Sequence, residues 1–210
     1  MLTLNDARQW YYAYDEVHGF GHIERVYALC QQIGHTEGAD MEILLTAALL
    51  HDAQGSHPGE GGRNEHHLRS AEFAGKLLAD MGWHESRIQA VQACIISHRY
   101  RKDDLPQSLE AKVLFDADKL DVIGAIGVVR ALAYAFQIST PAFHEPSPSF
   151  LSSWEKEAHE PHSAYHEYLF KLKNIAAILL TPSARKIARS RQKFLNEFFE
   201  ELAREMRAEA

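Results

Sequence analysis

Residues 43–52 read Ile43-Leu44-Leu45-Thr46-Ala47-Ala48-Leu49-Leu50-His51-Asp52, an apolar run that ends in a histidine and an aspartate. The run consists largely of helix formers without a polar stripe, so it predicts a helix that is buried on nearly all sides. The glycine-rich residues 55–63 follow at once, so we expect the helix to end where the polar pair begins. Alone, a His-Asp pair is more typical of a solvated helix end. At the edge of a dry core, however, such groups need a partner or a metal, because unpaired buried charge is costly.

Composition limits the class of protein before any motif is considered. The chain has 210 residues, 46% of them hydrophobic, which is enough for one packed domain, or one domain with an appendage. A net charge of −7 argues against nonspecific binding to polymeric nucleic acid or to an anionic membrane surface. Residues 1–14 lack the apolar block of a signal peptide, and no apolar stretch reaches the length of a membrane span. We therefore expect a cytoplasmic protein in which Cys30 and Cys94 are buried free thiols.

Apolar residues recur at helical spacing through most of the chain, and alternating strand patterns are missing, so we expect an all-α fold. The expected helices cover about residues 22–34, 41–52, 65–81, 85–99, 109–136 and 163–180, with a last helix from residue 182. Asn64, Ser108 and Thr181 are candidate helix caps, the last followed by a proline at the first helical position. Residues 137–162 contain four prolines and fit no helix, which predicts a long irregular insert or lid.

Aspartates interrupt the apolar pattern of the expected helix 109–136. Asp118 shares one side of that helix with Leu114 and Val129, whereas Asp116 points well away at about 100° per residue. Asp121 lies three residues beyond Asp118 and is expected near it. Asp118 is therefore the acidic residue that this pattern directs toward the core.

Four polar residues stand on otherwise apolar helix faces: His22, His51, Asp52 and Asp118. They belong to three expected helices, so one bundle can bring them together. Two imidazoles and two carboxylates suit Mn²⁺, Mg²⁺, Fe²⁺ or Zn²⁺, and leave positions for water and a substrate oxygen. A divalent ion can lower the pKa of water from 15.7 to about 7 and can neutralise charge on a phosphoryl oxygen. Such a site would supply metal-bound hydroxide at neutral pH.

The order His, His-Asp and distant Asp resembles the HD superfamily of metal-dependent phosphohydrolases. Residues 116–125, Asp-Ala-Asp-Lys-Leu-Asp-Val-Ile-Gly-Ala, and residues 22–26 resemble a bacterial single-domain subgroup, one member of which is a nucleoside triphosphate pyrophosphohydrolase. The resemblance extends over about residues 15–200. It implies one all-α, HD-type helical bundle over residues 1–210, with the irregular insert 137–162 before the last two helices.

The resemblance also implies a ligand set for a divalent ion, which would be Mn, Mg, Fe, Co, Ni or Zn. The implied metal ligands are His22, His51, Asp52 and Asp118. Asp118 is preferred to the neighbouring aspartates because the family's last ligand is followed by one residue and then leucine, as here. One departure is visible, because relatives read His-Asp before the first ligand where this chain reads His18-Gly19-Phe20-Gly21-His22. The missing acid puts in doubt the substrate-orienting role of that aspartate.

Further residues are candidates for catalysis beside Asp52. His98 extends an apolar face and could act as a general acid or bind phosphate, although a satisfied core histidine gives the same pattern. Lys119, next to a ligand, could hold a phosphate, and a surface lysine is equally compatible. His66-His67 and the run His159-Glu160-Pro161-His162 are expected on the surface.

Candidates for substrate binding are His18, Arg25, His57 and Arg63. His57 and Arg63 lie in the glycine-rich loop, where cations can close over a phosphate, although an ordinary solvated loop fits as well. For His18 and Arg25, a loop histidine without a task and an ordinary salt bridge are the alternatives.

The expected activity is hydrolysis of a nucleotide or other small phosphate ester by metal-activated water, including release of pyrophosphate from (deoxy)nucleoside triphosphates. A nucleoside monophosphate phosphatase on the same site is the nearest alternative, and a non-catalytic metal or nucleotide sensor is a further one. A di-iron bundle is excluded because its paired Glu-x-x-His motifs are missing. The expected partner is a small phosphorylated substrate, and the apolar last helix is compatible with a homodimer as well as a monomer.

Overall fold

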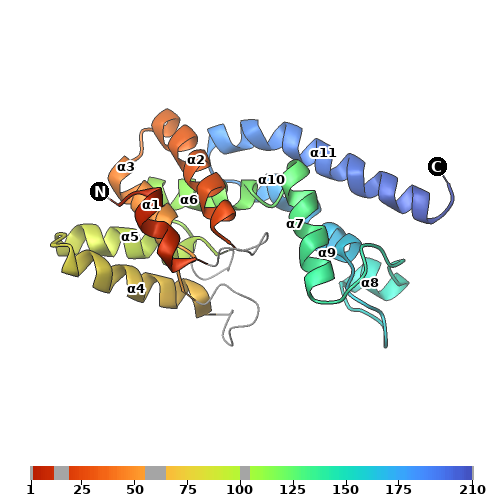
Figure 1. The fold of residues 1–210 in the computed structure, drawn as a ribbon. Coiled ribbons are helices and arrows are strands. Elements are labelled where there is room, and N and C mark those ends of the chain that lie inside the picture. The colour runs from red at the N-terminus through yellow and green to blue at the C-terminus, as the bar shows by residue number, and fades with distance from the viewer. Residues whose placement is uncertain (1, 12–18, 55–64, 100–104, 210) are drawn as a thin grey trace. The chain divides into compact units, whose positions relative to one another are not determined.

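The structure is a computed structural model that describes residues 2–11, 19–54, 65–99 and 105–209. Every regular element in these ranges is a helix, so the predicted all-α fold is confirmed (Figure 1). The chain forms two compact units. The first comprises Met1–Asp118 and Leu180–Ala184, and the second comprises Lys119–Leu179 and Arg185–Ala210.

The first unit is built around one apolar helix, α3 Met41–Leu50. The helices that begin in this unit are α1 Leu4–Ala7, η1 Arg8–Trp10, α2 Phe20–Glu37, α3, α4 His66–Asp80, α5 Glu85–Ser97 and α6 Leu109–Leu120. Residues 44–50 of α3 are all buried, and α3 packs against α2, α4 and α5, as its sequence predicts. Asp40 caps α3 by accepting from two backbone N–H groups, and the helix ends directly before His51. The polar pair therefore lies at the end of the central helix.

The expected helix over residues 109–136 is wrong in one respect, because it consists of two helices, α6 and α7 Gly124–Gln137. Ser108 caps α6 as predicted, with its Oγ accepting from the N–H of Ala111 at 3.1 Å. The break comes at Gly124, whose φ of +77° favours glycine. A break changes the helical phase, so residues counted at 100° across it no longer share a face. Val129, predicted to point inward, is 58% exposed.

The second unit contains shorter helices packed on the long C-terminal one. Its further elements are α8 Pro148–Ser153, α9 Ala164–Phe170, η3 Leu172–Asn174, α10 Ile175–Ile178 and α11 Pro182–Met206, the last of which begins in the first unit. The expected helix 163–180 is thus three short pieces. The Gln192 side chain on α11 donates to Leu172 O and accepts from Ala176 N, which satisfies backbone groups at these interruptions. Tyr168 stacks on Phe199 with ring centroids 4.7 Å apart.

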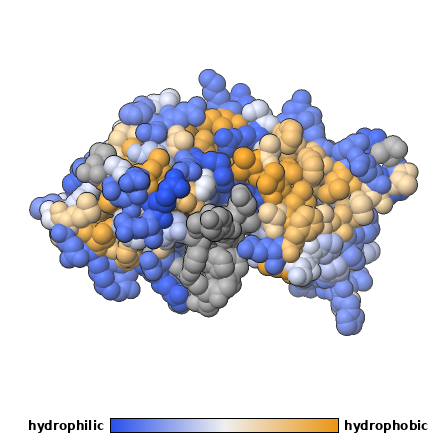
Figure 2. All heavy atoms as spheres, viewed as in Figure 1, coloured by the Kyte–Doolittle hydropathy of each residue, from blue (hydrophilic) through white to orange (hydrophobic). Residues whose placement is uncertain are grey.

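Apolar side chains of α7 are exposed, and Figure 2 shows the hydrophobic colouring gathered over that helix. Within the described residues no single helix has the length and apolar character to span a membrane. Only α6 and α7, taken together as a bent pair, meet that test of length and composition. Cys30 and Cys94 are free and buried, as predicted.

Candidate functional site

His51 is held in a defined tautomer at the end of α3. Its Nδ1 lies 2.8 Å from Ala48 O, and because a carbonyl oxygen only accepts, Nδ1 carries the hydrogen. The side chain is fully buried, and burial lowers the pKa of His51 below its ordinary 6.5 despite the neighbouring Asp52 carboxylate. His51 is therefore a neutral imidazole whose Nε2 lone pair faces the site.

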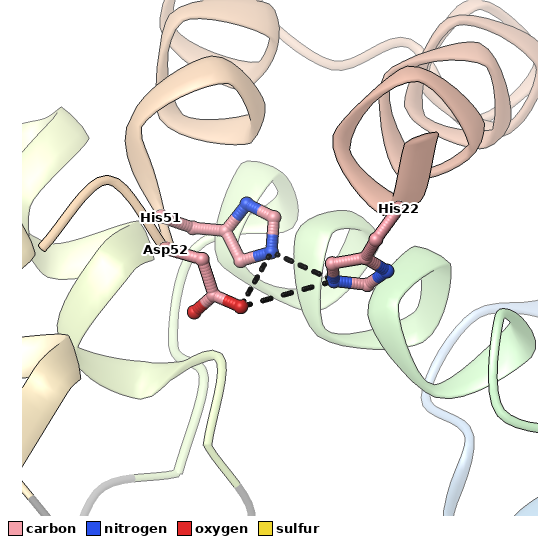
Figure 3. Close-up of side chains that lie close together, drawn as sticks. All are labelled: His22, His51 and Asp52. Carbon is pink, nitrogen blue, oxygen red and sulfur yellow. Dashed lines mark hydrogen bonds and ion pairs between the residues drawn. The ribbon is translucent and has the colours of Figure 1, made fainter. Parts of the chain in front are cut away.

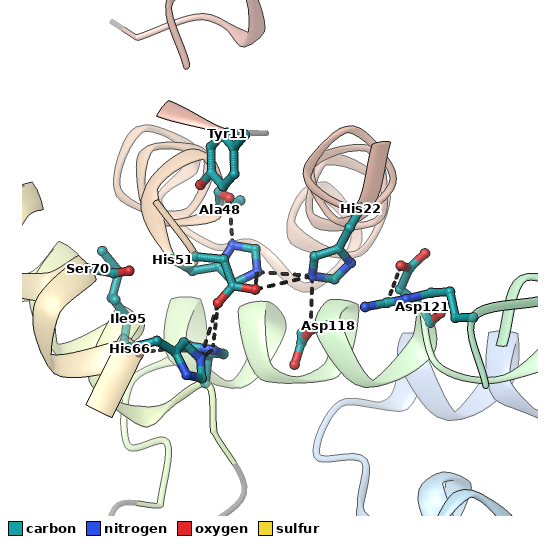
Figure 4. A network of polar contacts seen from close by, with 12 residues as sticks. Tyr11, His22, Ala48, His51, His66, Ser70, Ile95, Asp118 and Asp121 are labelled. Atoms are coloured by element: carbon teal, nitrogen blue, oxygen red, sulfur yellow. Dashed lines mark hydrogen bonds and ion pairs between the residues drawn. The ribbon is translucent and has the colours of Figure 1, made fainter. Parts of the chain in front are cut away.

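The four residues expected to bind a metal lie together (Figures 3 and 4). His22 Nε2, from the first turn of α2, lies 3.4 Å from His51 Nε2 and 3.4 Å from Asp118 Oδ1 of α6. Asp52 Oδ2 lies 3.9 Å from both of these histidine nitrogens. His22 is 2% exposed, and Asp52 is also buried. Three segments of the first unit thus bring two nitrogen and two oxygen donors around one point.

A second pair of histidines meets the other oxygen of Asp52. Asp52 Oδ1 lies 3.3 Å from His66 Nε2 and 3.6 Å from His98 Nε2, and these two nitrogens are 3.4 Å apart. His66 begins α4, and His98 follows α5 with its Nδ1 2.6 Å from Ile95 O. His98 faces the core as predicted. The two carboxylate oxygens of Asp52 are therefore divided between two pairs of imidazoles.

The expectation that His66-His67 lie on the surface is wrong. The His66 side chain is only 12% exposed, and His67 is buried. The sequence held a signal for this, because His66, Ser70 and Ala74 recur every four residues and so share one helix face. Ser70 and Ala74 are both buried, which makes that face the inward one. Extending that inward face of α4 back by one turn would have included His66 in the site.

The ionisation of Asp52 results from two opposing effects. Burial alone would raise its pKa, but the positive charge that the neighbouring histidines carry when protonated and the hydrogen bond with His66 outweigh burial and hold the pKa well below its usual value. Asp52 is therefore a carboxylate at neutral pH. Nearby, the Tyr11 hydroxyl donates to Leu49 O at 2.7 Å, and burial raises the pKa of Tyr11 well above 10.0. Tyr11, which the sequence did not single out, fixes the last turn of α3 as a neutral donor.

The donor set fits a divalent ion by both spacing and chemistry. Two atoms that are each about 2.1 Å from one ion are about 3.0 Å apart at a right angle and about 4.2 Å apart on opposite sides. The measured separations around His22, 3.4–3.9 Å, lie within that range. A neutral Nε2 lone pair directed at a carboxylate oxygen is repulsive unless a cation or proton lies between them. These residues therefore suit a bound cation better than an empty core.

The neighbouring aspartates of α6 have other partners. Asp116 is fully buried and accepts from Leu180 N at 2.8 Å and from Thr181 N at 2.7 Å, which ties the start of α11 to α6. Asp121 forms an ion pair with Arg130 Nη1 at 2.6 Å. Asp118 Oδ1, in contrast, lies 3.4 Å from His22 Nε2.

The remaining candidates are placed less fully. Arg25 is half-buried on α2, with its guanidinium folded back beside Gly21. Lys119 opens the second unit, and its role toward phosphate stays a prediction, as does that of Arg25. The other candidates lie outside the described residues: His18, His57 and Arg63, together with the capping residue Asn64.

Comparison with known families agrees with this arrangement. The family model described as HD domain matches residues 19–123, which contain all four convergent donors. The chain belongs to the HD domain family. Its HD domain therefore runs from the N-cap of α2 to the residue before α7.

Similar proteins share the fold of nearly the whole chain. The YpgQ protein of Bacillus subtilis (strain 168) is 28% identical over 193 residues, covering 90% of this chain and 84% of that protein. A crystal structure of YpgQ in complex with ADP matches with a TM-score of 0.73 at 26% identity, covering 97% of both chains. A predicted HD superfamily hydrolase from an uncultured Thermotogales bacterium matches with a TM-score of 0.64 at 29% identity, covering 97% of this chain and 90% of that one. The fold is thus that of HD-superfamily hydrolases.

Proposed function

We propose that the protein is a metal-dependent phosphohydrolase that acts on a nucleotide or another small phosphate ester. The observation that carries this proposal is the convergence of His22, His51, Asp52 and Asp118, with the neutral Nε2 of His51 directed at carboxylate oxygens. The family adds support, since solved relatives are described as HD-superfamily hydrolases. The complex of YpgQ with ADP supports a nucleotide as the ligand class.

Each residue has a distinct part in the proposed site. His22, His51, Asp52 and Asp118 would hold the ion, which when bound supplies positive charge against phosphoryl oxygens and lowers the pKa of water. Ala48 O fixes the tautomer of His51, and outer hydrogen bonds of this kind orient metal-binding imidazoles. Asp118 brings an oxygen donor from α6 to within 3.4 Å of the His22 Nε2 of α2.

His66 and His98, at the other oxygen of Asp52, would hold a proton and donate it to the leaving group. Hydrolysis of a phosphate ester breaks a P–O bond, and the departing oxygen needs a proton. Asp52 Oδ1 lies 3.3 Å from His66 Nε2 and 3.6 Å from His98 Nε2 and would stabilise a proton on either nitrogen. That proton could then pass to the departing oxygen of the substrate. The first unit thus offers a cation-binding side and a proton-holding side that share one carboxylate.

The proposal is tested by product analysis with a panel of substrates and metals. Nucleoside triphosphates, nucleoside monophosphates and a simple aryl phosphate are each incubated with Mn²⁺, Mg²⁺, Fe²⁺, Co²⁺, Ni²⁺ or Zn²⁺, and with chelator. We expect metal-dependent release of pyrophosphate from a triphosphate, whereas inorganic phosphate from a monophosphate would identify the phosphatase alternative. Full activity of the His51→Ala protein in metal-free buffer would overturn metal dependence. Tight nucleotide binding without hydrolysis under any metal would favour the sensor.

A further inference from the structure

A second group of metal-binding side chains lies entirely within the second unit. It consists of His144, Glu160 and His166, each of which offers one ligand atom, all within 4.8 Å of one another. His166 Nε2 lies 2.9 Å from Glu160 Oε1, and both side chains are buried. None of these residues belongs to the candidate site of the first unit. The run 159–162 was expected on the surface, and for Glu160, whose side chain is 4% exposed, that expectation is wrong.

The histidine rings are already oriented for a cation. His144 Nδ1 lies 2.9 Å from Glu145 O, which can only accept, so the lone pair of the neutral ring is on Nε2. His166 Nδ1 lies 2.7 Å from Ser163 Oγ, which can accept its hydrogen because a hydroxyl rotates. Burial lowers the pKa of His166, so the ring is neutral at pH 7. Hydrogen bonds of this kind, to the ring nitrogen away from the ion, are typical of metal-binding histidines.

Glu160 can bind an ion without losing the contacts that position it. Its Oε2 accepts from Ser147 Oγ and from Glu157 N, both at 2.7 Å. Its Oε1 accepts from Ser147 N at 2.8 Å and from His166 Nε2. An ion in place of the His166 proton would take over one lone pair of Oε1 and leave the other three contacts unchanged. The carboxylate is therefore held in place by neighbours that do not compete with a cation.

We propose that His144, Glu160 and His166 form a second divalent-metal site, which takes Zn²⁺ or a similar borderline ion and ties the segment before α8 to α9. Two imidazoles and one carboxylate are a ligand set that Zn²⁺ adopts, whereas Mg²⁺ prefers oxygen ligands. On binding, the hydrogen of His166 moves from Nε2 to Nδ1, where Ser163 Oγ accepts it, so no proton is released at neutral pH. Water completes the coordination at His144, the most exposed of the three ligands.

The test compares wild type with His144→Phe, which keeps an aromatic ring beside His166 but removes the nitrogen donors. His159→Asn is the matched control, because His159 is exposed in the same segment and asparagine tolerates its positive φ. Bound Zn²⁺ per chain is measured by elemental analysis after dialysis. The melting temperature is measured with Zn²⁺, with Mg²⁺ and with chelator. Folding of each variant is checked by circular dichroism.

We expect wild type and His159→Asn to retain about one more Zn²⁺ per chain than His144→Phe. At about 100 times the dissociation constant, Zn²⁺ should raise the melting temperature of wild type by about 5 °C or more beyond its effect on His144→Phe, and Mg²⁺ should give no such difference. Equal zinc content and equal zinc-induced shifts in wild type and His144→Phe would overturn the site. If His144→Phe does not fold, His144→Gln, whose amide can still donate to Glu145 O, decides by the same criteria. Since no readout is enzymatic, the result is independent of the proposed function.

Discussion

The two histidine–carboxylate groups of this molecule use their carboxylates differently. Asp52 in the first unit lies against imidazoles on both oxygens, two at Oδ2 and two at Oδ1. Glu160 in the second unit accepts from two backbone N–H groups and one hydroxyl as well as from one imidazole. Both are carboxylates among histidines in a helical protein, and Glu160 also holds the backbone of its segment through Ser147 N and Glu157 N.

Because of this difference, we expect the Asp52 group to serve function and the Glu160 group to serve stability. Neutral imidazoles direct lone pairs at the carboxylate of Asp52. This arrangement in the first unit is electrostatically repulsive unless a cation or a proton lies between them. Glu160 needs no ion to be satisfied. Its buried carboxylate oxygens already accept hydrogen bonds from backbone N–H groups of the protein. Substitutions in the first group should therefore alter the rate as well as metal binding, whereas substitutions in the second should alter stability and its own metal binding but not the rate.

The sharpest test of this contrast is Asp118→Asn, which keeps the shape of a proposed ligand and removes its charge. We expect phosphate-ester hydrolysis to fall at least about 100-fold, since even residues that only orient metal ligands cost 10–100-fold when changed. Bound metal should fall in parallel, and circular dichroism should show intact helices. Asp116→Asn, two residues away, is the matched control. It should lower the free energy of unfolding by about 1–3 kcal/mol through its lost contacts with Leu180 and Thr181, while metal content is retained. The same behaviour in both variants would contradict the assignment of Asp118.

His66→Gln probes the proton-holding side of Asp52. We expect the rate to fall about 10–100-fold, because glutamine can still donate a hydrogen bond to Asp52 but cannot carry a mobile proton. The pH profile of the rate should also change, which a purely structural effect would not produce. His35→Gln, on an exposed position of the same unit, should leave both unchanged. An unaltered rate and pH profile in His66→Gln would remove this histidine from the mechanism.

Glu160→Ala tests the supporting role of the second group. Ser147 N and Glu157 N lose their acceptor, so the free energy of unfolding should fall by about 1–2 kcal/mol in metal-free buffer, as measured by urea denaturation. Glu155→Ala, at an exposed position in the same segment, should change it little. Stability equal to that of wild type would show that Glu160 does not hold this segment.

The smallest expected effect is a pH dependence in the second unit. Burial alone would raise the pKa of Glu167, but the hydrogen bond with His162 and the charge of Lys171 lower it to about 2. A carboxylate with a lowered pKa in the folded state contributes stability above its unfolded value, near 4.5, and that stability is lost as the pH falls toward about 2. The difference in unfolding free energy between wild type and Glu167→Gln should therefore shrink between pH 5 and pH 3. A difference that stays constant over this range would exclude the lowered pKa.

Local patterns in the sequence determined much of the architecture. The apolar run before His51, the cap at Ser108 and the Thr181-Pro182 start of α11 depend on neighbours within one turn, and each is observed. The inward faces of α2 and α6 follow from helical periodicity, and α3 is apolar on nearly all sides, so the approach of His22, His51 and Asp118 could be expected before any coordinates.

Only the tertiary structure decided features that depend on residues far apart in the chain. Asp116 finds its partners 64 and 65 residues later, and His66 reaches Asp52 only because α4 begins beside the end of α5, at His98. Helix periodicity also could not reveal the break at Gly124, where a Cβ would come within 3.1 Å of Arg191. Burial and partners are properties of the packed chain, because the same polar residue is solvated or confined according to what other segments place against it.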